Sequence, residues 1–290
     1  MKPLKILILV VVNYLQAYVR HFKNIVGFVA LSLWATSTHA APQKIVSLNL
    51  CTDQLLMLLA DPNQIASLSK IVDDPHVSLL AEKSAKFQKN RGDAEEIFID
   101  NPEIVVAGVY TEKATVQILQ SLGVRVEIFP IEQNFNDIIE NIRKMGLLVG
   151  HLDRAERMID DFNIRLEELR SGITERPRAA IYSANGYTTG TDTMSGQILK
   201  TAGFQNITEE VGMSFGGILP LETLVMLQPD LVITGKAYPG HSRSEEILKH
   251  PALRPIKATA QTDAKWICGT PAVLDAVAEL QRTHPEKGLK

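Results

Sequence analysis

The chain has few cysteines and no excess of basic charge. Two cysteines in 290 residues are too few for a disulfide-stapled small fold or a four-cysteine zinc site. The 30 Lys and Arg are outnumbered by 33 Asp and Glu, so nucleic acid is not an expected partner. Hydrophobic residues make up 45% and charged residues 22%, which excludes a disordered chain and a collagen-like or coiled-coil rod. Core burial must therefore stabilise the fold.

Several sequence motifs of catalytic and metal sites are also missing. No His-Glu-x-x-His zinc motif, phosphate loop or dinucleotide-binding glycine pattern occurs. The histidines after residue 40 form no recognisable ligand cluster; they are His76, His151, His241, His250 and His284. We therefore expect no catalytic residues, no resident cofactor and no protein-held metal.

Residues 1–40 differ in composition from the rest. They contain six Lys, Arg or His residues and no acidic residue. An apolar run of eleven, Ile25 to Ala35, is followed by Thr38-His39-Ala40, with small residues at positions −3 and −1. This pattern predicts a secretory signal peptide cleaved after Ala40 and a periplasmic mature protein. An uncleaved N-terminal anchor is the alternative, although the run is shorter than the ~20 residues of a membrane span.

Strands and helices alternate on both sides of a long helical stretch, which predicts an α/β fold with mostly parallel sheets. We expect an N-terminal lobe over 41–136, one inter-lobe helix over 137–172 and a C-terminal lobe over 173–290. The expected strands are 44–48, 103–107, 124–129, 178–183, 230–234 and 264–268. The expected shorter helices are 53–60, 115–122, 196–202 and 270–282.

The long helix is predicted from apolar residues that recur every three or four positions from Ile138 to Leu169. Asn134, with Asp137 three residues later, marks its start. A continuous helix of this length would form a rod of about 50 Å that could span two lobes. A break near Gly150 would leave two helices in its place.

An internal repeat predicts that the two lobes are similar. Residues 94–108 and 221–235 share a pattern of helix, proline-marked turn and aliphatic strand at an offset of 127 residues. The matched pairs are Glu95 and Glu222, Pro102 and Pro229, and Gly108 and Gly235.

About residues 44–282 resemble one protein family in three features. These are the start Lys-Ile-Val-Ser-Leu-Asn (44–49), the repeated motif Glu-x-(Ile/Leu)-x4-Pro-(Glu/Asp)-(Ile/Leu)-Val, and the long central helix. It is the helix-backbone (class III) group of periplasmic substrate-binding proteins of ABC importers, in the iron–siderophore and vitamin B12 (cobalamin) branch. The resemblance implies that two lobes close modestly on a ligand held between them. It also implies a monomer that delivers its ligand to a membrane permease with its ATPase.

The expected ligand is a ferric siderophore or cobalamin, with haem as the alternative. The sequence does not distinguish these ligands, because selectivity among them depends on the shapes of the loops. Ligands of parallel sheets bind beyond the carboxyl ends of the strands, and aromatic and amide groups suit a large, flat, partly apolar ligand. Arg91 could meet an anionic chelate. The candidate ligand residues are Asn49, Cys51, Thr52, Arg91, Tyr110, Asn185, Tyr187, Phe215, Tyr238 and Trp266. As alternatives, the tyrosines are ordinary strand-end residues and Trp266 packs in the core.

The resemblance also implies a role for the repeated glutamates. Glu95 and Glu222 are expected to pair with arginines of the permease. Each alone is also explained as a carboxylate at a helix N-terminus.

Cys51 and Cys268 both follow expected strands, one in each lobe. They could be free thiols, an inter-lobe disulfide or soft ligands for copper(I). Free thiols are favoured because a covalent tie would oppose opening. A periplasmic thiol enzyme or redox protein that uses Cys51 is the rival function.

Overall fold

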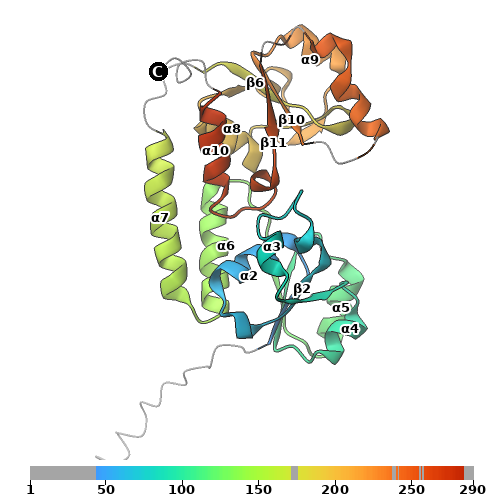
Figure 1. The fold of residues 1–290 in the computed structure, drawn as a ribbon, viewed down its shortest axis with the longest axis vertical. Coiled ribbons are helices and arrows are strands. Elements are labelled where there is room, and N and C mark those ends of the chain that lie inside the picture. The colour runs from blue at the N-terminus through green and yellow to red at the C-terminus, as the bar shows by residue number, and fades with distance from the viewer. Residues whose placement is uncertain are drawn as a thin grey trace, which may run out of the picture. The chain divides into compact units, whose positions relative to one another are not determined.

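The computed structural model describes most of the chain after residue 43 (Figure 1). The described residues are 44–170, 176–236, 240, 242–254, 256 and 258–283. The expected leader and the candidate ligand residue Tyr238 lie outside them. Residues 41–290 form one compact unit.

The first lobe is built on a five-stranded parallel sheet with strand order β3-β2-β1-β4-β5. The strands are β1 (Ile45–Ser47), β2 (Ile65–Ser69), β3 (Gln88–Asn90), β4 (Ile104–Gly108) and β5 (Val126–Phe129). The central strands are buried on both faces because helices cover the sheet, which explains their aliphatic sequences. The helices of this lobe are α2 (Leu50–Leu59), α3 (Ala81–Ser84), α4 (Ala94–Ile99) and α5 (Lys113–Ser121), with 3₁₀ turns η2 (Pro62–Gln64) and η3 (Lys70–Asp73).

The second lobe has a four-stranded parallel sheet with strand order β11-β10-β6-β8 and a separate antiparallel pair, β7 and β9. The strands are β6 (Arg178–Ile181), β7 (Tyr187–Thr189), β8 (Gln205–Asn206), β9 (Gly216–Ile218), β10 (Leu231–Gly235) and β11 (Ala258–Thr262). The helices are α8 (Met194–Thr201), α9 (Leu221–Leu227) and α10 (Val273–Gln281). The 3₁₀ turns are η4 (Ala184–Gly186), η5 (Ile207–Val211), η6 (Arg243–Lys249), η7 (Pro251–Leu253) and η8 (Ala264–Trp266).

The prediction of one continuous helix over 137–172 is wrong: the segment forms two helices, α6 (Phe135–Leu148) and α7 (Leu152–Arg170), packed side by side. The predicted cap is present, since Asn134 Oδ1 accepts the N–H groups of residues 136 and 137. Gly150 ends α6 in the left-handed region (φ 77°). The N–H of His151 donates to Gly146 O at 2.8 Å and that of Gly150 to Leu147 O at 3.3 Å, which is a Schellman motif. The chain therefore reverses between the two helices.

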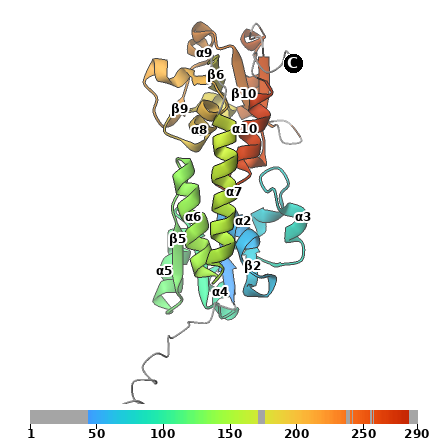
Figure 2. The same cartoon turned by 90° about the vertical axis from the view of Figure 1, so that its left-hand side faces the viewer.

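Of the two helices, α7 contacts both lobes through its side chains. At its start, Arg154 donates to Leu59 O in the first lobe at 2.6 Å, and near its end Arg165 pairs with Asp275 of α10 in the second lobe at 2.5 Å. Figure 2 shows α7 running from one lobe to the other with α6 beside it. At about 1.5 Å per residue its 19 residues give ~28 Å, shorter than the predicted rod but long enough to bridge the lobes.

The repeat inferred from the sequence has matching geometry in the two lobes. Asn101 and Gln228, 127 residues apart, are both left-handed, with φ of 49° and 48°. Their N–H groups donate to the carbonyls of Phe98 and Val225, at 3.1 and 3.2 Å. Each closes a short helix, α4 or α9, before the proline-marked turn into β4 or β10. The fold is thus two similar α/β lobes with mostly parallel sheets, as the sequence predicted.

The last predicted strand is wrong. Residues 264–268 begin with the 3₁₀ turn η8, in which Asp263 Oδ1 accepts the N–H of Lys265 at 3.0 Å. The strand of this region is β11, which pairs in parallel with β10. Its sequence, Ala-Thr-Ala-Gln-Thr, carries small and polar side chains, so a search for aliphatic runs passes over it. Trp266 consequently lies on a turn and packs against the main core.

Candidate ligand-binding cleft between the lobes

Segments that follow the carboxyl ends of strands in the two lobes meet at one place. Cys51, in the first turn of α2 after β1, forms a disulfide with Cys268, which follows β11 and η8 in the second lobe. Gly269 contacts Glu132, which follows β5 in the first lobe. Ligands of open parallel sheets bind beyond these strand ends. The segments after these strand ends, beside the Cys51–Cys268 disulfide, are therefore the candidate site.

The disulfide overturns the preference for free thiols. The Cα atoms of Cys51 and Cys268 are 5.1 Å apart, within the usual range of a disulfide. Both cysteines of the chain are used in this bond, so neither can serve as a thiolate nucleophile or a copper ligand while it is formed. The objection that a tie would oppose opening carries less weight here, because α7 already restricts how far the lobes can separate.

Glu132 forms a second contact between the lobes. Its carboxylate accepts the side-chain amide of Asn141 at 2.6 Å and the backbone N–H of Gly269. Burial raises the pKa of Glu132, and these two hydrogen bonds oppose the rise. A Cβ on residue 269 would lie only 2.6 Å from Glu132 Cδ. Glycine at 269 therefore allows the two loops to pack closely.

The predicted aromatic residues are presented to solvent from both lobes. Tyr110, just after β4, has 84% of its surface exposed. In the second lobe, Tyr187 (47% exposed) begins β7 and Phe215 (59% exposed) precedes β9. The β7–β9 ladder and a hydrogen bond from Gly190 N–H to Phe215 O fix this aromatic pair. Such rings suit a large ligand with flat apolar faces.

Two polar candidates on the first lobe act within the fold. Asn49 caps α2 by accepting the N–H of Cys51 at 2.9 Å, and it packs closely against Gly108 at the end of β4. Thr52 is buried, and its hydroxyl bonds Ser47 Oγ at 2.8 Å and the carbonyl of Asn49 at 2.9 Å. The Thr52 hydroxyl is therefore used within the fold, and Thr52 is not proposed to bind ligand.

The remaining candidates are Arg91, Asn185, Glu95 and Glu222. Arg91 follows β3 and is exposed, and its backbone N–H donates to Glu96 Oε2 at 3.2 Å. Asn185 has a left-handed backbone (φ 56°) in η4 and lies two residues before Tyr187. Glu95 and Glu222 are exposed in the first turns of α4 and α9. Both helices lie on the side of the molecule away from α7 (Figure 1).

Asp53, which the sequence analysis did not single out, is a buried carboxylate near the disulfide. It accepts the N–H of Ser69 at 3.1 Å and the hydroxyls of Ser69 and Ser47, which joins α2 to the end of β2. Burial raises the pKa of Asp53 to about 7, against the lowering effect of these hydrogen bonds and of Lys89. Asp53 was passed over because an acidic residue in the first turn of a helix is ordinary at the sequence level.

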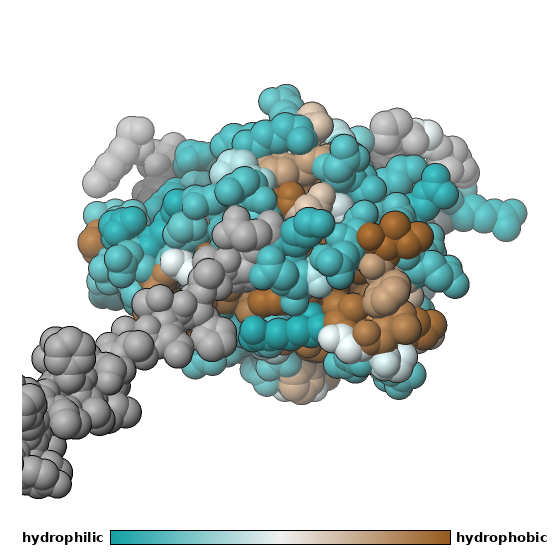
Figure 3. All heavy atoms as spheres, turned by 90° about the horizontal axis from the view of Figure 1, so that it is seen from below, coloured by the Kyte–Doolittle hydropathy of each residue, from teal (hydrophilic) through white to brown (hydrophobic). Residues whose placement is uncertain are grey.

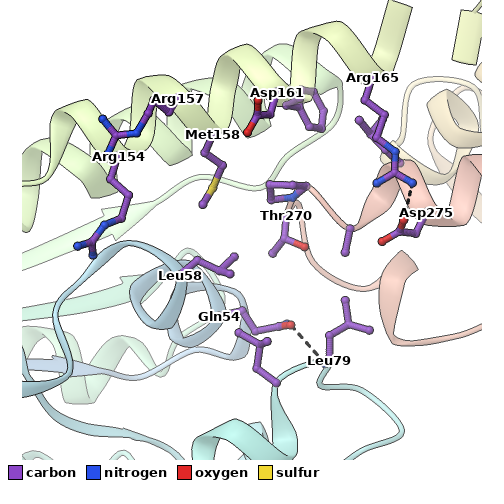
Figure 4. A pocket seen from close by; sticks show the side chains of 15 residues that line it. Gln54, Leu58, Leu79, Arg154, Arg157, Met158, Asp161, Arg165, Thr270 and Asp275 are labelled. Carbon is purple, nitrogen blue, oxygen red and sulfur yellow. Dashed lines mark hydrogen bonds and ion pairs between the residues drawn. The ribbon is translucent and has the colours of Figure 1, made fainter. Parts of the chain in front are cut away.

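A cavity of about 640 Å³ lies between α2, α7 and the start of α10 (Figure 4). Its wall is mostly apolar, with Gln54 and Thr270 among the polar groups. Two of its arginines, Arg154 and Arg165, are paired with Asp61 and Asp275. None of the predicted ligand residues that the structure describes lines this cavity.

Residues 212–216 read Gly-Met-Ser-Phe-Gly, which matches the Gly-x-Ser-x-Gly pattern of serine hydrolases and was missed at the sequence level. That pattern indicates a nucleophile only on a sharp turn from a strand into a helix. Here a 3₁₀ turn, η5, precedes it and strand β9 follows it. The geometry therefore gives no support for a hydrolase site.

Within the described part of the chain, no group of three or more His, Cys, Asp or Glu side chains is placed to hold a metal ion. Within the same residues, no helix is both long enough and apolar enough to cross a bilayer.

Comparison with known proteins supports the two-lobed fold. Two curated cobalamin-binding proteins, from two strains of Halobacterium salinarum, are each 24% identical over 206 residues. That match covers 69% of this chain and only 56% of theirs. The periplasmic haem-binding protein HutB of Vibrio cholerae superposes with a TM-score of 0.70 at 16% identity, over 84% of this chain and 99% of that one. The vitamin B12-binding protein BtuF of Vibrio cholerae gives 0.65 at 16% identity, over 86% and 99%. The sequence model of the periplasmic binding protein family matches residues 45–264, and the chain belongs to that family.

Proposed function

We propose that this protein is the substrate-binding component of an ABC importer and that it captures a large ring or chelate ligand between its lobes. The candidates are cobalamin, a ferric siderophore and haem, and cobalamin is tested first because the curated relatives are named for it. The observation that carries the proposal is the exposure of Tyr110, just after β4 in the first lobe, and of Tyr187 and Phe215, beside the β7–β9 ladder in the second.

The proposed protein has no catalytic chemistry of its own. The rival, a thiol enzyme using Cys51, is not favoured because that sulfur is bonded to Cys268. Residues 1–40 are proposed to be a signal peptide removed after Ala40, which would release the mature protein in the periplasm. Mass spectrometry of the exported protein tests this, since retention of residues 1–40 would contradict it.

Trp266 provides a fluorescent reporter for ligand binding. It is the only tryptophan after residue 40 and lies two residues before Cys268. Protein beginning at Ala41 is titrated with cyanocobalamin, haem, a ferric hydroxamate and a ferric catecholate. At least one should bind with a Kd below about 10 μM, which corresponds to roughly 7 kcal/mol. If none does, the proposed ligand class is wrong.

Delivery is proposed to occur by docking on a membrane permease with its ATPase, with Glu95 and Glu222 facing permease arginines. Both glutamates are exposed, one on each lobe, at equivalent positions of the repeat. Exposed charge pairs mainly set orientation and encounter rate. The double change E95Q/E222Q should therefore lower uptake of the ligand in cells while its Kd for the purified protein stays the same. A parallel loss of ligand affinity would contradict the docking role.

A further inference from the structure

Two of the most exposed apolar side chains in the described residues occupy the same place in the repeat. Tyr110 (84%), Met226 (82%) and Ile99 (80%) are the three large apolar residues with the highest exposed fractions. Tyr110 is one of the candidate ligand residues. Ile99 and Met226 are 127 residues apart, which is the offset of the repeat. Single exposed apolar residues are common, but a matched pair on the two lobes calls for a shared cause.

The repeat gives both residues the same setting. Ile99 comes four residues after Glu95 on α4, and Met226 comes four residues after Glu222 on α9. Residues four apart lie on one face of a helix, with Cβ atoms roughly 6 Å apart. Each lobe therefore presents one carboxylate and one bare apolar side chain side by side.

Neither apolar residue is needed inside the fold. The inward positions of the two helices are filled by Ile97 and Leu224, which are completely buried. Helices α4 and α5 pack against each other and carry two further exposed apolar side chains, Phe98 and Ile118. Figure 3 shows hydrophobic side chains gathered on the surface at the α4 and α5 edge.

We propose that Ile99 and Met226 are apolar anchors of the docking surface and that their partner is a pair of identical membrane subunits. This inference rests on the proposed function. Each subunit would offer a cationic side chain beside an apolar hollow. The repeat presents the same carboxylate and apolar pair twice, and a two-fold symmetric partner presents its complement twice. The negative charge of Glu95, Asp93, Glu96 and Asp100 around the patch on α4 favours a cationic partner over a second copy of this chain.

The apolar anchors add what the glutamates cannot supply alone. An exposed ion pair contributes little affinity in water. Apolar side chains packed around it exclude water and contribute their own burial on binding. The glutamates would then orient the complex, and Ile99 and Met226 would slow its dissociation.

Site-specific photocrosslinking tests this surface without knowledge of the ligand. The photoreactive residue p-benzoylphenylalanine replaces Ile99, Met226 or, as a control, Ile164 in the full chain expressed in its native cells. Ile164 is 62% exposed on α7, a helix that lies on the side of the molecule opposite α4 and α9 (Figure 1). Positions 99 and 226 should both crosslink to the same polytopic membrane protein, identified by mass spectrometry, and position 164 should not. Adducts no stronger than those at 164, or adducts with a second copy of this chain, would overturn the proposal.

Matched variants separate this inference from the proposed function. I99S/M226S should reduce uptake of the ligand identified by the titration at least tenfold, with unchanged ligand Kd and unchanged melting temperature, whereas I164S should have no effect. If E95Q/E222Q lowers uptake and I99S/M226S does not, the apolar anchors are refuted and the docking glutamates stand. If neither double variant lowers uptake, docking through this face is refuted altogether.

Discussion

The disulfide between Cys51 and Cys268 should contribute much of the stability of the fold. The two cysteines are 217 residues apart, so the bond lowers the conformational entropy of most of the unfolded chain. In the chain-entropy description a loop of this length is worth roughly 5 kcal/mol. Domains are typically stable by only about 5–15 kcal/mol, so the loss should be large. The folded lobes should still stay together, because α7 and the contact between Glu132 and Gly269 also join them.

Urea unfolding of the oxidised protein, the reduced protein and C51S/C268S measures this contribution. Reduction and the double change should lower the unfolding free energy by the same several kcal/mol, and reductant should have no further effect on C51S/C268S. Thiol titration of the denatured protein should find no free thiol before reduction and two after it. Two free thiols in the untreated exported protein, or an unfolding midpoint unmoved by reduction, would refute the covalent tie.

Three further results are expected. Burial raises the pKa of Asp53 to about 7 from its ordinary 3.8, so the folded state holds a proton that the unfolded chain releases. The free energy of unfolding should therefore fall as pH rises from about 4 to about 7. Between pH 5 and 8, D53N should lose roughly 3 kcal/mol less than the wild type. Equal pH slopes of the unfolding free energy for the two proteins, measured with urea, would contradict this. Gly146→Ala should destabilise the fold by about 1–3 kcal/mol although alanine has the higher helix propensity, because the new Cβ would overlap that of Ala155. A higher melting temperature would refute this packing argument. Tyr110→Ala should weaken ligand binding about tenfold in fluorescence titration without changing the melting temperature, and unchanged affinity would remove Tyr110 from the site.

The two-lobe plan could be predicted because the repeat encodes it. Glu95 and Glu222, with the proline-marked turns that follow, predicted equivalent helices and strands, and the matching left-handed residues Asn101 and Gln228 agree with that reading. The central aliphatic strands were also found, since burial on both faces leaves a clear apolar run.

The reversal at Gly150 could not be read from periodicity. Both α6 and α7 turn an apolar face to the same core, so their stripes join without a break in spacing. The spacing of apolar residues shows which face of a helix is buried, but it does not show the direction in which the helix runs. Gly150 was the available signal, because glycine is the usual residue at the left-handed end of a helix.

The disulfide and the cavity beside α7 depend on tertiary structure. The 217 residues between the cysteines do not show whether they are bonded, which follows only once the segments after β1 and β11 are known to meet. Strand β11 itself lacks the aliphatic pattern that marks its neighbours. Gln54 and Thr270, from different lobes, line one cavity only after folding.

The most direct test of the account is a crystal structure of the protein with the tightest-binding ligand of the titration. The ligand should lie beyond the strand ends and contact Tyr110 of the first lobe together with Tyr187 or Phe215 of the second. A ligand held by one lobe alone, or seated in the cavity beside α7, would contradict the claim that the two lobes share their cargo.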